Sequence, residues 1–130
     1  MAPAQEDLHI SAIELPGRVR VVRLEGETDA VQQPRLRAAM SAAVRSGVAG
    51  VVVDLSRLRF CDSCGLRELV LAHGNPEGVV VVLAAPTAQF LRLAEITGVD
   101  QVVAIRPTVA AALTTALAAA ARRGPDLPPQ

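Results

Sequence analysis

Residues 50–73 of the chain read GVVVDLSRLRFCDSCGLRELVLAH. The run Val51-Val52-Val53 is typical of a strand that is covered on both faces, and we expect this strand over Gly50–Leu55. Leu66, Leu69 and Val70 recur at helical spacing, which predicts a helix from about Ser63 to His73. A loop from Ser56 joins the two. A buried strand that leads into a helix indicates an α/β fold.

The same pattern repeats outward from this stretch. A turn at Pro16-Gly17 predicts an opening hairpin, and Glu25–Asp29 is expected to be a polar loop. A helix should begin at Pro34 and end near Gly47. The other expected strands cover residues 8–15, 18–24, 79–84 and 102–105, and the other expected helices cover residues 87–97, capped by Gly98, and 108–121, capped by Thr108.

The predicted order is β-β-α-β-α-β-α-β-α. Strands that are joined through helices must be parallel neighbours, whereas the opening hairpin adds an antiparallel edge. We therefore expect a mixed sheet of four to five strands with about four helices. In the last helix, the stripe formed by Ala112, Leu113, Ala116 and Leu117 should be largely buried against the sheet.

The chain has the size and composition of one folded domain. It has 130 residues, of which 51% are hydrophobic and 20% charged, and this composition excludes an intrinsically disordered protein. We place the domain at residues 8–121. Residues 1–7 are expected to be a flexible extension, and residues 122–130 a flexible, Pro-rich tail.

Charge and composition exclude several classes of partner. Thirteen basic residues balance thirteen acidic ones, so the surplus of positive charge that nucleic-acid binding needs is absent. With Phe60 and Phe90 as the only aromatic residues, there is no platform on which bases could stack. No apolar run approaches the roughly 20 residues that cross a bilayer, and the first residues do not resemble a signal peptide. We expect a cytoplasmic protein that binds neither nucleic acid nor membrane.

Catalysis has little support in the sequence. His9 and His73 are the only histidines, and no Ser-His-Asp or metal-ligand spacing is present. Glycine-rich phosphate loops are absent as well. We therefore expect no enzyme activity, no cofactor and no metal.

Cys61 and Cys64 form a C-x-x-C sequence between a strand and a helix, as in thioredoxin-like redox proteins. A helix N-terminus would lower the pKa of such a thiol. Against a redox role, Cys61 fits better as a small buried apolar residue at the end of a strand. Counting free thiols after treatment with a mild oxidant would separate the two interpretations.

Asp62, Ser63 and Gly65 lie at the mouth of the helix. Asp62 or Ser63 can cap the free amide groups there, and each such cap contributes about 0.5–2 kcal/mol. Gly65 costs roughly 0.5–1 kcal/mol in a helical turn, which suggests that another surface approaches it closely. Local spacing alone favours a simple helix cap.

Three segments together resemble the STAS domain family, whose best-known members are bacterial anti-sigma factor antagonists. Asp54-Leu55-Ser56 and Phe60–Leu66 resemble its D-L-S…D-S-[ST]-G-L signature. Leu24–Asp29 resembles its L-x-G-E-[hydrophobic]-D element, and Leu91–Val99 its L-x-L-x-G-[hydrophobic] helix end. The resemblance spans about residues 8–120.

The sequence departs from the family pattern at two positions. Cys64 replaces the usual Ser or Thr after the key serine, and Thr28 replaces the usual leucine. Neither change removes the acceptor position.

The resemblance implies a partner-switching phosphoprotein that regulates transcription in bacteria. Ser63 would be phosphorylated by an anti-sigma factor with a serine-kinase domain. Ser56 is the nearest competitor for this modification, but it directly follows the expected strand and should be partly enclosed by it. Unphosphorylated, the protein would bind that factor and free a sigma factor. Phosphorylation would prevent the binding. The implied partner-binding residues are Asp62, Ser63, Cys64, Gly65, Leu66, Arg67, Glu27 and Asp29.

A serine phosphatase is a further implied partner, and the protein would be a monomer or a weak dimer. Within the family, a stand-alone scaffold is the alternative, as in a stressosome subunit or a lipid-transport accessory protein.

Overall fold

The computed structural model describes residues 8–45 and 47–123. The described residues form five strands and four α-helices in the predicted order. The strands are β1 (His9–Leu15), β2 (Val19–Thr28), β3 (Gly50–Cys61), β4 (Val80–Ala84) and β5 (Ala104–Arg106). The helices are α1 (Gln33–Ala43), α2 (Ser63–His73), α3 (Ala88–Thr97) and α4 (Val109–Arg123), with a short 3₁₀ helix, η1 (Val99–Gln101), before β5.

The strands form one mixed sheet in the spatial order β1-β2-β3-β4-β5, which is also their order along the chain. β1 pairs antiparallel with β2, and each later pair of neighbours is parallel. The predicted mixed sheet and the predicted antiparallel edge are thus confirmed.

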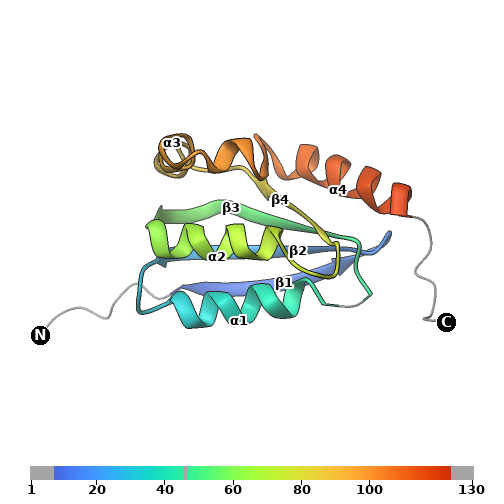
Figure 1. Ribbon diagram of the computed structural model, residues 1–130, viewed down its shortest axis with the longest axis horizontal. Helices are drawn as coiled ribbons and strands as arrows, with labels where there is room; N and C mark the ends of the chain where they lie inside the picture. The colour runs from blue at the N-terminus through green and yellow to red at the C-terminus, as the bar shows by residue number, and fades with distance from the viewer. Residues whose placement is uncertain (1–7, 46, 124–130) are drawn as a thin grey trace, which may run out of the picture.

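Helices cover both faces of the sheet. α1 and α2 lie side by side in front of the strands (Figure 1), and with α3 they bury the larger apolar cluster. α4 packs on the opposite face. The β3 side chains alternate accordingly: Val51 and Val53 belong to the larger cluster, whereas Val52 packs in the cluster beneath α4.

Small residues let α4 lie close to the sheet. A Cβ atom on Gly50 would be 3.1 Å from Cβ of Ala116, closer than an ordinary contact, so glycine favours this approach. Ala112 and Ala116 are buried as predicted, and Leu113 is half-buried. Leu117, however, is 43% exposed, which corrects the predicted stripe. The Leu117 side chain lies beside the Pro-Gly turn, because a Cβ atom on Gly17 would be 2.8 Å from Leu117 Cδ2.

Several predicted boundaries are wrong. Glu25–Thr28 was expected to be loop but belongs to β2, and Ser56–Cys61 belongs to β3. These polar segments pair with each other, for example Glu27 with Phe60, across two shifts of register. α1 ends at Ala43 instead of near Gly47, and the residue that follows it, Val44, is buried in the core.

The last strand begins two residues later than predicted. Val102 and Val103 both donate their N–H groups to the carbonyl of Val99, which continues the turn of η1 before β5 can start. The expected extension, residues 1–7, and most of the expected tail, residues 124–130, lie outside the described residues. Residues 122 and 123 belong to α4, not to the tail.

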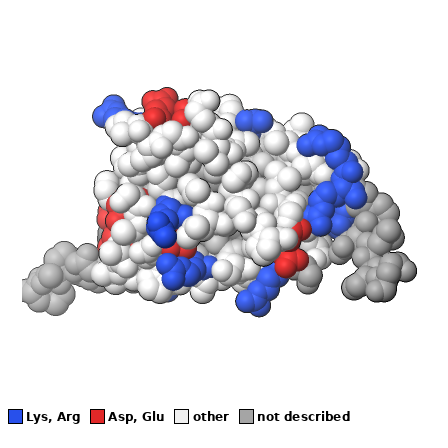
Figure 2. Space-filling view, in the orientation of Figure 1, with Lys and Arg blue, Asp and Glu red and all other residues white. Residues whose placement is uncertain are grey.

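Charges of both signs are present on the face shown in Figure 2, with broad uncharged areas between them. Several arginine side chains gather at the right of this view. Within residues 8–45 and 47–123, no helix is both long and apolar enough to cross a bilayer.

Candidate functional site

The candidate site lies where β2 and β3 end side by side. These strands are parallel, and Thr28 at the end of β2 pairs with Cys61 at the end of β3. Asp29 and Asp62 therefore follow at the same edge of the sheet. Ser63 is the first residue of α2, and its side chain is exposed. The structure brings together at this edge the residues that the sequence analysis grouped.

Asp62 caps α2. Its backbone is extended, and its Oδ1 accepts a hydrogen bond of 3.0 Å from the N–H of Gly65. The N–H of Leu66 donates to the Asp62 carbonyl at 3.0 Å. These two bonds fix the first turn of the helix and hold Ser63 at the surface.

Gly65 is required because α2 begins almost on top of β2. A Cβ atom at this position would lie 2.2 Å from Oγ1 and 2.6 Å from Cβ of Thr28. The sequence analysis expected another surface to approach Gly65 closely, and that surface is β2 of the same chain. Thr28, the residue that replaces the family's usual leucine, is the side chain that meets Gly65.

Asp54, the first residue of the Asp-Leu-Ser segment, is buried. Its Oδ1 accepts from the N–H of Ser56 at 3.0 Å, and its Oδ2 from Nε of Arg23 at 3.4 Å. Asp54 is also the last β3 residue that pairs with β4. Ser56 follows beyond that pairing and is exposed, so the prediction that Ser56 is partly enclosed is wrong.

Gln89, which the sequence analysis did not identify, holds the end of β3. Its Oε1 accepts from the N–H of Cys61 at 3.0 Å, and its Nε2 donates to the Cys61 carbonyl at 2.8 Å. The side-chain amide thus takes the place that a neighbouring strand would occupy past the end of β4. Gln89 comes from the first turn of α3, so α3 positions the residue just before the cap.

The two acidic residues at the end of β2 have local partners. Glu27 Oε2 accepts from Nη2 of Arg59 at 3.4 Å. Asp29 Oδ1 accepts from the N–H of Gln32 at 3.0 Å, which stabilises the turn into α1. Both carboxylates are half-buried and lie at the same edge as Ser63.

The remaining predicted contact residues fall into two groups. Asp62 and Cys64 are half-buried and Arg67 is exposed, so all three present some surface beside Ser63. Gly65 and Leu66 are buried and offer no surface to a partner, which corrects their expected role as contacts. They support the surface from beneath by holding α2 on the sheet.

Comparison with known proteins assigns the family. The family model described as "Mlab, STAS domain" matches residues 11–106. The chain belongs to the STAS domain family. A search of curated protein sequences finds no match.

Solved structures share the fold of this STAS domain. An anti-sigma factor antagonist from Mycobacterium paratuberculosis is 29% identical, with a TM-score of 0.79 over 88% of this chain and 98% of that one. The antagonist SpoIIAA in its unphosphorylated form is 21% identical, with a TM-score of 0.69 over 92% and 100% of the two chains. Phosphorylated SpoIIAA from Bacillus is 20% identical, with a TM-score of 0.63 over 82% and 98%.

We expect that Gln89→Ala destabilises this STAS domain by about 1–3 kcal/mol, because it leaves two backbone groups of buried Cys61 without partners. Urea unfolding measures the change. Gln101→Ala is the matched control, since the Gln101 side chain is exposed and bonds only to neighbouring Asp100 at 3.5 Å. Equal stability of the two variants would contradict this role of Gln89.

The two cysteines of the STAS domain are both free thiols. Cys61 is buried, as predicted, and burial raises the pKa of its thiol to about 11. A thiol with such a pKa stays protonated near neutral pH, whereas a redox-active cysteine reacts as the thiolate. The geometry therefore opposes the thioredoxin-like interpretation of the C-x-x-C sequence.

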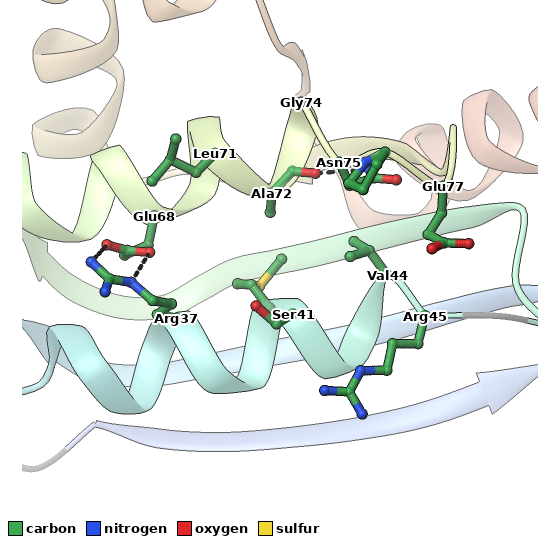
Figure 3. A pocket seen from close by; sticks show the side chains of 12 residues that line it. Arg37, Ser41, Val44, Arg45, Glu68, Leu71, Ala72, Gly74, Asn75 and Glu77 are labelled. Carbon is green, nitrogen blue, oxygen red and sulfur yellow. Dashed lines mark hydrogen bonds and ion pairs between the residues drawn. The ribbon is translucent and has the colours of Figure 1, made fainter.

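Away from Ser63, a groove of about 430 Å³ runs between α1 and the later part of α2 (Figure 3). At one end of it, the buried carboxylate of Glu68 accepts from Nε and Nη2 of Arg37, at 3.2 and 3.1 Å, and from Nε2 of Gln33 at 2.8 Å. The hydrogen bonds from Arg37 are the main cause that lowers the pKa of Glu68. This cluster joins α1 to α2.

The groove offers no catalytic set. Its lining residues include the Ser41 hydroxyl but neither histidine nor cysteine that could activate it. In the described part of the chain, no three His, Cys, Asp or Glu side chains come together in a way that could hold a metal ion.

Proposed function

We propose that this STAS domain is an anti-sigma factor antagonist that is switched by phosphorylation of Ser63. Unphosphorylated, it binds an anti-sigma factor with a serine-kinase domain and thereby frees a sigma factor. Phosphorylated, it does not bind. The observation that carries the proposal is the exposed hydroxyl of Ser63 at the start of α2, in a chain that is 29% identical to an antagonist.

The helix start accommodates a phosphate. The N–H groups of Gly65 and Leu66 donate to Asp62. The N–H groups of Ser63 and Cys64 come earlier in the first turn, where the helix itself supplies no carbonyl to accept them. Amide groups and the helix dipole both favour an anion at this end. The folded domain therefore tolerates phosphoserine at position 63.

The contact surface does not tolerate it. A phosphate adds about −1.5 to −2 charges at pH 7 beside the Asp62 carboxylate. Glu27 and Asp29 lie at the same edge of the sheet and add to the negative field. Arg67, four residues after Ser63 and exposed, offsets part of that charge. We propose that Asp62, Ser63, Cys64, Arg67, Glu27 and Asp29 form the surface that meets the anti-sigma factor, with a serine phosphatase acting on the same Ser63 in the cytoplasm.

A stand-alone STAS scaffold is the second candidate function. It is favoured by the matching family model, whose description names Mlab and not an antagonist. A scaffold would bind its partner whatever the state of Ser63, so phosphorylation separates the two candidates.

The test combines capture and labelling. The Ser63→Ala chain is used as bait in native cytosol, and we expect it to retain an anti-sigma serine kinase. That kinase, with ATP, should then phosphorylate the wild-type chain once, at Ser63, and should not label Ser63→Ala. Ser56→Ala is the matched control because Ser56 is exposed as well, and it should be labelled normally. Unchanged binding after labelling would favour the scaffold, and label on Ser56 in place of Ser63 would contradict Ser63 as the acceptor.

A further inference from the structure

β1 has an open edge. It is the outermost strand of the sheet and pairs with β2 alone, so within the described residues one row of its backbone N–H and C=O groups has no strand beside it. Most β1 side chains are exposed. The opposite edge differs, because β5 has three residues, all half-buried, and contacts η1.

The β1 edge lacks the features that normally prevent an edge strand from pairing with a strand of another molecule. Natural edge strands carry lysine, proline or bulges, or are very short. β1 has seven residues without lysine, arginine or proline, and pairs with β2 over seven consecutive residues without a register shift. Its only charged residue is Glu14, whose Oε2 accepts from Nη2 of Arg20 at 2.9 Å in the same chain. The edge is thus regular in its register, and four of its seven residues are apolar.

We infer that β1 is a dimerisation strand, which pairs antiparallel with β1 of a second copy around a two-fold axis at Ala12. The two sheets then become one continuous sheet. The interface is isologous, so each copy contributes the same strand. This inference does not rest on the proposed function, since β1 contributes none of the residues of the candidate site, which lies where β2 and β3 end.

The register follows from which face each side chain occupies. Ile13 and Leu15 pair with Val21 and Val19, which pack on the α4 side, whereas Ala12 pairs with Val22 on the α1 side. Directly opposed residues share a face, so a two-fold axis must place one residue opposite its own copy. Centring the axis on Ala12 gives full overlap of His9–Leu15.

That register creates no clash of charge. Ser11 lies opposite Ile13 of the second copy on the α4 face. On the α1 face, Glu14 lies opposite Ile10 and therefore does not meet a second glutamate. Charge and symmetry thus favour a second copy of this chain as the occupant of the edge.

The surroundings of the edge are apolar as well. Ile13 is 59% exposed on the α4 face. On the α1 face, a hollow of about 360 Å³ lies between β1 and α1, and its lining is mostly small and apolar: Ile10, Ala12, Val22, Ala39, Ala42 and Ala43, with Ser11 and Arg20. The two-fold axis brings the hollows of both copies to the same interface, which removes them from water.

The test uses two variants of the full chain that differ only in the sign of the charge at position 11. Ser11→Lys with Ile13→Lys sets lysine against lysine twice across the axis. Ser11→Glu with Ile13→Lys sets glutamate against lysine at the same two places. By sedimentation velocity over a range of concentrations, we expect the wild type and the Glu/Lys variant to dimerise. The Lys/Lys variant should dissociate roughly tenfold to a hundredfold more readily than the Glu/Lys variant.

Val102→Lys is the matched control, because Val102 is 56% exposed beside the opposite edge, and it should dimerise as the wild type does. Circular dichroism checks that every variant is folded. A wild type that stays monomeric at all concentrations would overturn the inference. Equal dissociation of the Lys/Lys and Glu/Lys variants would overturn it too, since residues 11 and 13 are opposed only in the register centred on Ala12.

A cross-link tests the axis directly. In a chain carrying Cys64→Ser, the additional change Ala12→Cys places two thiols opposite each other, with Cα atoms about 4.5–5.5 Å apart, within reach of a disulfide. We expect a covalent dimer after mild oxidation, and none for Val102→Cys in the same background. Equal cross-linking of both variants, or of neither, would contradict the axis at Ala12.

Discussion

Ser63→Glu is expected to weaken binding to the anti-sigma factor by about 1–3 kcal/mol, the scale of like-charge and desolvation penalties in a contact surface. The melting temperature should stay close to that of the wild type, because an anion at a helix N-terminus is favourable by about 0.3–1 kcal/mol. Calorimetric titration and thermal unfolding of the same samples measure both quantities.

Two variants bracket this result. Ser63→Ala should bind as tightly as the wild type, because it removes the acceptor hydroxyl without adding charge. Ser41→Glu adds the same charge at an exposed position on α1, away from the site, and should leave binding unchanged. The mechanism is wrong if Ser63→Glu unfolds the domain, or if it binds as well as Ser63→Ala does.

Gly65→Ala should destabilise the folded domain. The added methyl group would overlap Oγ1 and Cβ of Thr28, at 2.2 and 2.6 Å, so α2 must move away from β2. Overpacking of this kind typically costs about 1–3 kcal/mol. Urea unfolding should show the loss, and binding should weaken as well because Ser63 moves with the helix.

Gly74→Ala at the other end of α2 is the matched control. A Cβ there has no heavy atom closer than 3.7 Å, an ordinary contact, so this change should be tolerated. In a chain that already carries Thr28→Gly, the cost of Gly65→Ala should shrink, because both overlapping atoms are gone. An undiminished cost would mean that the close approach to Thr28 is not the reason for glycine.

Local patterns predicted the helices well and the strand lengths poorly. The bounds of α2, Ser63–His73, follow from spacing and capping within the segment itself, and the structure confirms them. The polar ends of β2 and β3 look like loops on their own. They become strands because they pair with each other across more than thirty residues of sequence, as Glu27 does with Phe60.

In the candidate site, too, the features set by neighbouring residues were predicted and those set by distant residues were not. The cap at Asp62 and the exposure of Ser63 depend on neighbouring residues, and both were predictable. The role of Gln89 was not predictable, because this residue lies 28 positions from Cys61 in the sequence. Its side-chain amide bonds the Cys61 backbone as a neighbouring strand would. Nothing in the sequence marks a glutamine in a first helical turn for that role. The exposure of Ser56 was missed for a related reason, since it depends on where β4 ends.

The coincidence of strand order with chain order has a consequence for biosynthesis. Each strand joins the edge that the preceding strand has just formed, so no strand must be inserted between two others. Domains acquire structure from the N-terminus as the ribosome extends the chain. We expect this sheet to grow strand by strand during translation, with the nascent β2 edge and then the β3 edge open until the next segment emerges. α4, which contacts β2, β3, β4 and β5, can settle only after the last of them has been made.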